Sequence, residues 1–162
     1  MKEAAQLAGF LAADAVLRVA TGASLPPLII FEKGDGTSQI IQIEESSPQK
    51  AASKGENLLR ANAGGAERGV MAFDAYLNLP QGRTDAIFLQ ARQYVPSIQA
   101  ILLAVPYRHA SHPRGFAVHR PKIFVVEEQP LPETEVVAAF FLGVDRHEKG
   151  GKFWYEHYDA SY

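Results

Sequence analysis

The chain of 162 residues is predicted to form a single domain, residues 1–162, and its 47% hydrophobic and 21% charged residues exclude extensive disorder. The 16 basic and 18 acidic residues leave a net charge of −2, which argues against a dedicated nucleic-acid binder. The absence of cysteine excludes disulfides, thiolate metal sites and cysteine nucleophiles.

The first predicted element is a helix over residues 2–21, which are rich in alanine and leucine and contain no proline. Asp14 and Arg18 are four residues apart and are expected to form an ion pair on its wetter side. Glu3 and these two charges are atypical of a secretory signal, and no apolar run is long enough to cross a membrane. We therefore expect a cytoplasmic protein with no membrane segment.

A β-hairpin and a second helix are predicted next. Residues 27–32 and 38–44 have the pattern of strands, and the Lys-Gly-Asp-Gly sequence between them favours a tight turn. Ser47 and Pro48 are typical of a helix start, with serine as the cap and proline in the first turn. This helix is expected to run to about Asn62.

After the second helix the hydrophobic period changes to two, which indicates β-strands. The predicted strands cover residues 69–79, 84–95, 98–107 and 116–126. The first two are expected to be joined by a turn of Pro80, Gln81 and Gly82. Because the connections are too short for helical crossovers, the sheet is predicted to be antiparallel.

The last predicted helix begins at Thr134, its expected cap, after a proline-containing loop over residues 127–135. Val136, Phe140 and Val144 recur at helical spacing, and a pair of glycines, Gly150 and Gly151, is expected to end the helix. The aromatic tail that follows is predicted to dock as a short final helix.

Together these elements predict an α+β fold with the order α-β-β-α-β-β-β-β-α and an antiparallel sheet of about six strands, with helices packed on one face. The other face is expected to be wet and half-apolar, with Val70, Phe88 and Tyr94 as its apolar members. Large apolar patches are rare on monomers, so the sequence predicts a homodimer.

Residues 107–122 form the most unusual segment, because they carry a formal charge of +4 without any acidic residue and leave −6 on the rest of the chain. The candidate residues are Arg108, His109, His112, Arg114, His119, Arg120 and Lys122. A basic hairpin on an acidic body could hold an anionic ligand or an acidic protein partner, and a merely solvated loop is the alternative. No carboxylate nearby in the sequence completes a metal site with the histidines, so neither a metal nor a cofactor is expected.

Two classes of function stay open. The absence of a complete catalytic motif favours a non-enzymatic binding or interaction protein. The alternative is a small hydrolase-type or isomerase-type enzyme with a cleft on the wet sheet face, whose candidate residues are Asp74, Tyr76, Asp85, Gln90 and Arg92. Asp74 or Asp85 would act as base and His119 as acid, and Arg92 or Arg120 would hold an anion. A pocket joining a carboxylate to an imidazole would favour this alternative.

Overall fold

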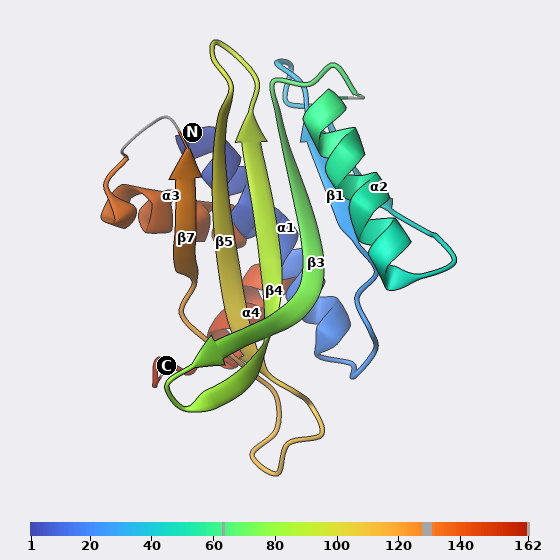
Figure 1. The fold of residues 1–162 in the computed structure, drawn as a ribbon. Helices are drawn as coiled ribbons and strands as arrows, with labels where there is room; N and C mark the ends of the chain where they lie inside the picture. Colours follow the sequence, from blue (N-terminus) through green and yellow to red (C-terminus); the bar gives the residue numbers. More distant parts are fainter. Residues whose placement is uncertain (63, 128–130, 162) are drawn as a thin grey trace.

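A computed structural model describes residues 1–62, 64–127 and 131–161, which form four helices and an antiparallel sheet of seven strands (Figure 1). In chain order the elements are α1 (Lys2–Val19), β1 (Leu28–Glu32), β2 (Ser38–Gln42), α2 (Pro48–Ala61), β3 (Arg68–Leu79), β4 (Gly82–Gln93), β5 (Gln99–Arg108), β6 (Ala117–Val118), β7 (Lys122–Glu127), α3 (Glu133–Arg146) and α4 (Glu148–Glu156). The strands are ordered β2-β1-β3-β4-β5, with both β6 and β7 pairing with β5. The predicted α+β class and antiparallel sheet are confirmed.

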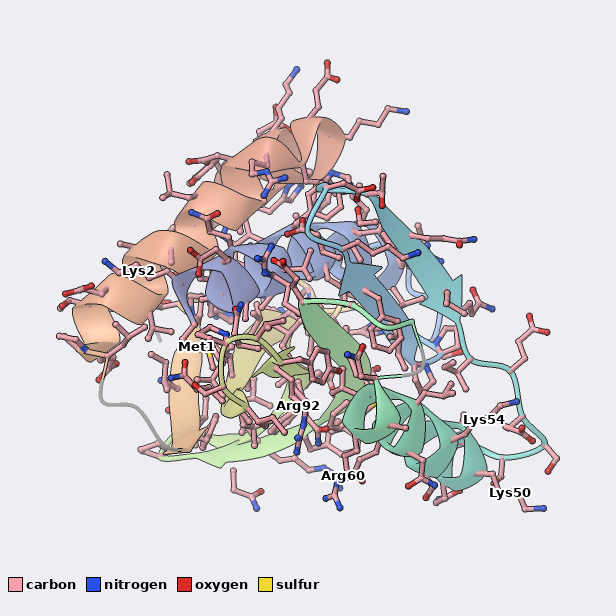
Figure 2. The ribbon with its side chains drawn as sticks, turned by 90° about the horizontal axis from the view of Figure 1, so that it is seen from above. Met1, Lys2, Lys50, Lys54, Arg60 and Arg92 are labelled. Carbon is pink, nitrogen blue, oxygen red and sulfur yellow. The ribbon has the colours of Figure 1, made fainter. Side chains whose placement is uncertain are left out.

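The helices lie on two sides of a curved sheet. α1 packs against the inner face, and α3 and α4 cover α1 from its other side (Figure 2). α2 lies on the opposite, outer face, over β1 and β3 (Figure 1). The main core therefore joins the inner face to three helices, as predicted for one face of the sheet, and includes Leu11, Leu28, Ile30, Val70, Ile87, Leu89, Leu103, Val105, Phe140 and Trp154.

α1 and α3 cross with their backbones in contact because each has a glycine at the crossing. A Cβ atom at Gly9 would lie 1.8 Å from the carbonyl oxygen of Phe140, and one at Gly143 would lie 1.8 Å from the carbonyl oxygen of Gln6. Both distances are far inside van der Waals contact, so no other residue fits at either position without moving a helix. The alanine-rich first helix is thus closely packed by α3 as well as by the sheet.

The β3–β4 hairpin corrects the predicted turn. The turn contains two residues, Pro80 and Gln81, and Leu79 pairs directly with Gly82, whose φ is +119°. The predicted turn of three residues would have shifted the register by one. Because a shift of one residue moves side chains to the opposite face, this difference changes which residues of β3 and β4 lie together.

The resulting register divides the predicted wet face. Asp74 pairs with Ile87, which belongs to the inner core, whereas Gln90 pairs with Leu102 of β5 on the outer face. Val70, expected on the wet face, is fully buried in the inner core. The grouping of these residues on one wet face was therefore wrong, although the alternation within each strand was correct.

The C-terminal region differs from prediction in two places. The predicted strand 116–126 is split into β6 and β7, because Pro121 lacks the N–H that a continuous ladder needs. The final helices separate at His147, and Gly150 and Gly151 lie inside α4 rather than ending a helix. A Cβ atom at Gly150 would lie 2.7 Å from the carbonyl oxygen of Ala13, so this glycine allows α4 to pack on α1.

The helix caps follow local chemistry. The Oγ of Ser47 accepts a hydrogen bond from the N–H of Lys50, which confirms the predicted cap of α2. Thr134 is not the cap of α3, which begins at Glu133. His147 caps α4, because its Nδ1 accepts a hydrogen bond from the N–H of Gly150. The predicted loop 127–135 includes residues 128–130, which lie outside the described residues.

Within the described part, every helix is too short or too polar to span a lipid bilayer.

Candidate functional site

The basic segment 107–122 is anchored to the body of the protein by Arg108. The Nε of Arg108 donates to the carbonyl oxygen of Gly115 at 2.8 Å, and its guanidinium forms an ion pair of 3.1 Å with Asp159. Only 12% of the Arg108 side chain is exposed. Arg108 therefore holds the hairpin and the C-terminal tail together and offers little charge to a ligand.

His119 also connects the hairpin to the C-terminal tail. Its side chain is fully buried, and its Nδ1 lies 2.9 Å from the carbonyl oxygen of Asp159. Burial lowers the pKa of His119 below its usual value, so the imidazole is neutral at physiological pH. The tail also pairs with Val118, which accepts from the N–H of Asp159 and donates to the carbonyl oxygen of His157. His119 is thus part of the internal packing of the hairpin.

Two histidines shape the tip of the hairpin. The Nδ1 of His109 accepts from the N–H of Ser111, and the Nδ1 of His112 accepts from the N–H of Arg114, each at 3.1 Å. Backbone hydrogen bonds join His112 to His109 and Gly115 to His112. The two imidazoles therefore act as local turn acceptors, and the tip has a defined shape before any ligand arrives.

The remaining cations of the segment face solvent. Arg114 and Arg120 are exposed and Lys122 is half-buried. Within the described residues, none of these three side chains forms a hydrogen bond or an ion pair. The structure thus divides the predicted candidates into two internal anchors, two turn-shaping histidines and three uncompensated cations.

Two neighbouring carboxylates, Asp74 of β3 and Asp85 of β4, lie on the inner side of the sheet. The hydroxyl of Tyr107 donates to both carboxylate oxygens of Asp74, at 3.0 and 3.2 Å. Burial, which outweighs this bond, raises the pKa of Asp74, and the neighbouring charge of Asp85 raises it further. Tyr76 pairs with Asp85 across the strands, and the guanidinium of Arg83 lies 3.6 Å from the centre of the Tyr76 ring.

The five sheet-face candidates consequently form two groups. Asp74, Tyr76 and Asp85 lie together on the inner side, whereas Gln90 and Arg92 point to the outer face. There, a pocket of about 180 Å³ contains both residues, and its lining consists of Glu56, Arg60, Gln90, Ala91, Arg92, Ala100, Ile101 and Leu102.

The structure does not assemble the proposed enzyme set. Asp74, one of the two predicted bases, accepts from Tyr107, and His119, the predicted acid, faces the backbone of Asp159. The other predicted base, Asp85, pairs with Tyr76 across the strands. Arg92 lies on the opposite face of the sheet from Asp74. Among the described residues, no three His, Asp or Glu side chains gather closely enough to hold a metal ion.

Comparison with known proteins assigns neither a family nor a function to this chain. No family model, curated protein or solved structure matches this chain significantly. The function must therefore be argued from the geometry of the described residues alone.

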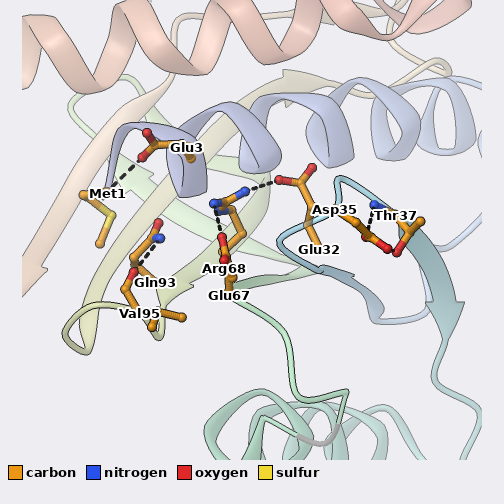
Figure 3. Close-up of polar contacts among 9 residues, drawn as sticks. All are labelled: Met1, Glu3, Glu32, Asp35, Thr37, Glu67, Arg68, Gln93 and Val95. Carbon is orange, nitrogen blue, oxygen red and sulfur yellow. Dashed lines mark hydrogen bonds and ion pairs between the residues drawn. The ribbon is translucent and has the colours of Figure 1, made fainter.

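Sequence reasoning missed the acidic partners of the buried arginines. Asp159 is 51 residues away from Arg108, and Glu32 is 36 residues away from Arg68, which it contacts across β1 and β3 (Figure 3). Neither pairing leaves a local signal, because the two members are brought together only by the fold. The one available hint is that Asp159 lies in an aromatic tail predicted to dock on the body.

The junction of hairpin and tail predicts a measurable pH dependence. Hydrogen bonds from Ser161, with a further one from Arg108, lower the pKa of Asp159 to about 2. Ionised Asp159 therefore stabilises the fold above about pH 4, and this contribution is lost as the pH falls through the folded pKa. Asp159→Asn is expected to lower Tm by a few degrees at pH 7 and to match the wild type near pH 2.

Thermal melts from pH 2 to pH 7 measure this difference. Glu156→Gln is the control, because Glu156 is exposed and lies 3.9 Å from its partner Lys152. A gap between Asp159→Asn and wild type that stays constant over the whole pH range would contradict the assignment.

Proposed function

We propose that this chain is a non-catalytic interaction protein that binds an anionic ligand or the acidic surface of a partner through hairpin 107–122. One observation carries the proposal: Arg114, Arg120 and Lys122 are uncompensated by the described residues and belong to a segment that turn hydrogen bonds and the pairing of β6 and β7 with β5 hold in shape. A preformed segment loses little conformational entropy on binding, so its charges contribute more fully to affinity. The cytoplasmic location and the homodimer expected from the sequence stay predictions.

Because the chain as a whole is slightly negative, binding of an anion depends on where its positive side chains gather. The whole chain carries −2, so a polyanion is repelled by the molecule as a whole and is attracted only by a concentrated basic surface. Arg108 is neutralised by Asp159, which leaves Arg114 in the loop after β5, Arg120 after β6 and Lys122 at the start of β7 as that surface. Binding through exposed cations should also weaken as salt screens the interaction.

The test is retention on polyanion columns. We expect the wild type to be retained on heparin or poly-glutamate resin at low salt, and Arg114→Glu with Arg120→Glu to pass through both. Heparin presents sulfates and poly-glutamate presents carboxylates, so the two columns distinguish the chemistry preferred.

A matched control removes the effect of net charge. Lys33→Glu with Arg146→Glu changes the charge by the same amount at two exposed positions outside residues 107–122, and should elute like the wild type. Failure of the wild type to bind either resin, or equal losses in the two double variants, would reject the proposal.

A further inference from the structure

No helix of the described chain covers the outer face of β4, β5 and β7, which carries apolar side chains such as Leu102 and Phe124 (Figure 1). A row of three aromatic rings leads from Phe73 of β3, which packs near α2, onto this face, with centroids 5.6 Å apart for Phe73 and Phe88 and 6.1 Å apart for Phe88 and Phe124. Phe124 is 48% exposed. Exposed aromatic rows of this kind are typical of surfaces that meet another protein.

The pocket between α2 and this face lies beside the aromatic row. Its floor consists of small and aliphatic residues, including Ala100 and Leu102, and its rim contains Arg60 from α2 and Arg92 from β4. Figure 2 shows both arginines extending on the outer side of the sheet, next to each other. The pocket thus combines an apolar base with two guanidinium groups.

The charges around the pocket leave an excess of one cation. Arg60 forms an ion pair of 2.7 Å with Glu56 on the same helix. Arg92 is half-buried and forms no hydrogen bond or ion pair with the described residues. A guanidinium with five donors beside an apolar wall is a strong recognition element for a carboxylate.

The position of α2 over the sheet is fixed close to this pocket. The hydroxyl of Tyr94, two residues after Arg92, donates to the carbonyl oxygen of Leu59 near the end of α2. Burial raises the pKa of Tyr94 to about 12, so the phenol keeps its proton and continues to donate. The two arginines therefore lie on elements that are tied to each other.

We propose that the groove between α2 and the outer face binds an acidic, apolar segment of a partner protein. A carboxylate side chain of that segment enters the pocket at Arg92 and Arg60, and its apolar neighbours lie over Leu102, Phe88 and Phe124. This site meets hairpin 107–122 only on β7, where Phe124 follows Lys122 by two residues, and the inference does not depend on the function proposed for that hairpin.

The volume of the pocket and the charges around it favour an acidic segment over a small molecule or a second copy of this chain. Small-molecule pockets usually enclose about 300–1,000 Å³, so 180 Å³ suits one anchoring side chain better than a metabolite. A second copy of this chain on a two-fold axis would bring its own surplus arginine to the same interface. An acidic segment instead neutralises Arg92 and covers the aromatic row.

Peptide selection with the full chain tests the inference. Immobilised wild-type protein is used to select from a displayed library of random twelve-residue peptides. We expect selected peptides to carry Asp or Glu near apolar residues, and their Kd to rise by about tenfold or more on Arg92→Gln. Changing the acid in the peptide to its amide should weaken binding to a similar extent, which tests the pocket without altering the protein.

Two controls make the result specific. Arg83→Gln changes an exposed arginine of the same strand that faces the inner side, and should leave the Kd unchanged. Arg114→Glu with Arg120→Glu should also leave it unchanged, since those residues belong to the other surface. Selection of no peptide, or of peptides without an acid, or equal affinity for the Arg92→Gln protein would overturn the inference.

Binding of a second copy of this chain in the groove would be detected by a different measurement. Sedimentation velocity would then show a dimer that Phe124→Glu dissociates, and this result would overturn the proposed acidic segment. The expected outcome is peptide binding that Phe124→Glu abolishes, with an oligomeric state that Phe124→Glu leaves unchanged. Thermal melts of each variant should lie close to the wild type, because Arg92 and Phe124 are surface groups on an intact sheet.

Discussion

Gly143→Ala is expected to lower the free energy of unfolding by about 3 kcal/mol or more, or to prevent folding. The new methyl group would lie 1.8 Å from the carbonyl oxygen of Gln6, and a backbone atom in a helix cannot rotate away. Helix propensity alone predicts the opposite sign, because alanine favours a helix over glycine by about 1 kcal/mol. Urea unfolding measures the difference, and Gly9→Ala should behave in the same way.

Gly55→Ala is the matched control in another helix. A Cβ atom there would lie 2.5 Å from the Sδ of Met71, which can move by changing rotamer. Its effect should stay within about 1 kcal/mol of zero, because relaxation of Met71 and the gain in helix propensity oppose each other. Equal effects of Gly143→Ala and Gly55→Ala would show that α1 and α3 do not cross as described.

Arg68→Met is expected to cost about 3 kcal/mol or more, because it leaves the carboxylate of Glu32 buried without a counter-charge. Arg68 contacts both Glu32 and Glu67, as Figure 3 shows, and the Glu67 contact is 2.9 Å long. The side chains of Arg68 and Glu32 are only 14% and 10% exposed. Equilibrium unfolding of the single variants gives the cost directly.

A double-mutant cycle separates the pair from the packing around it. Glu32→Met alone should cost less than Arg68→Met, since Arg68 keeps Glu67 as a partner. Arg68→Met with Glu32→Met should recover a large part of the stability, because no buried charge is left unpaired. Simple additivity of the two single effects would mean that the ion pair is not buried as described.

Much of the fold was predictable because its signals are local. The Ser47 cap, the Lys-Gly-Asp-Gly turn and the period-two pattern of β3 to β5 all depend on residues close together in the chain. Alternation along each strand was also correct. These features follow from side-chain geometry and turn chemistry, which need no distant partner.

The candidate site was predictable only in part. The concentration of cations in residues 107–122 is visible in the composition, but which of them are free is not. Arg108 is neutralised by Asp159, and His119 is buried and neutral. Both residues therefore hold the hairpin to the C-terminal tail and are not available to bind a ligand. Their partner, Asp159, lies in the C-terminal tail. The aromatic composition of that tail predicted that it docks on the body of the protein, but not which residues it contacts.

The pattern of neighbouring residues alone thus established the α+β class, the antiparallel strands and a basic segment at a hairpin. Only the folded molecule decided that Asp74 and Arg92 lie on opposite faces, because a turn of two residues instead of three reverses the faces of one strand relative to the next. Folding also selected which charges stay uncompensated, since electrostatic partners such as Arg108 and Asp159 meet across long stretches of chain.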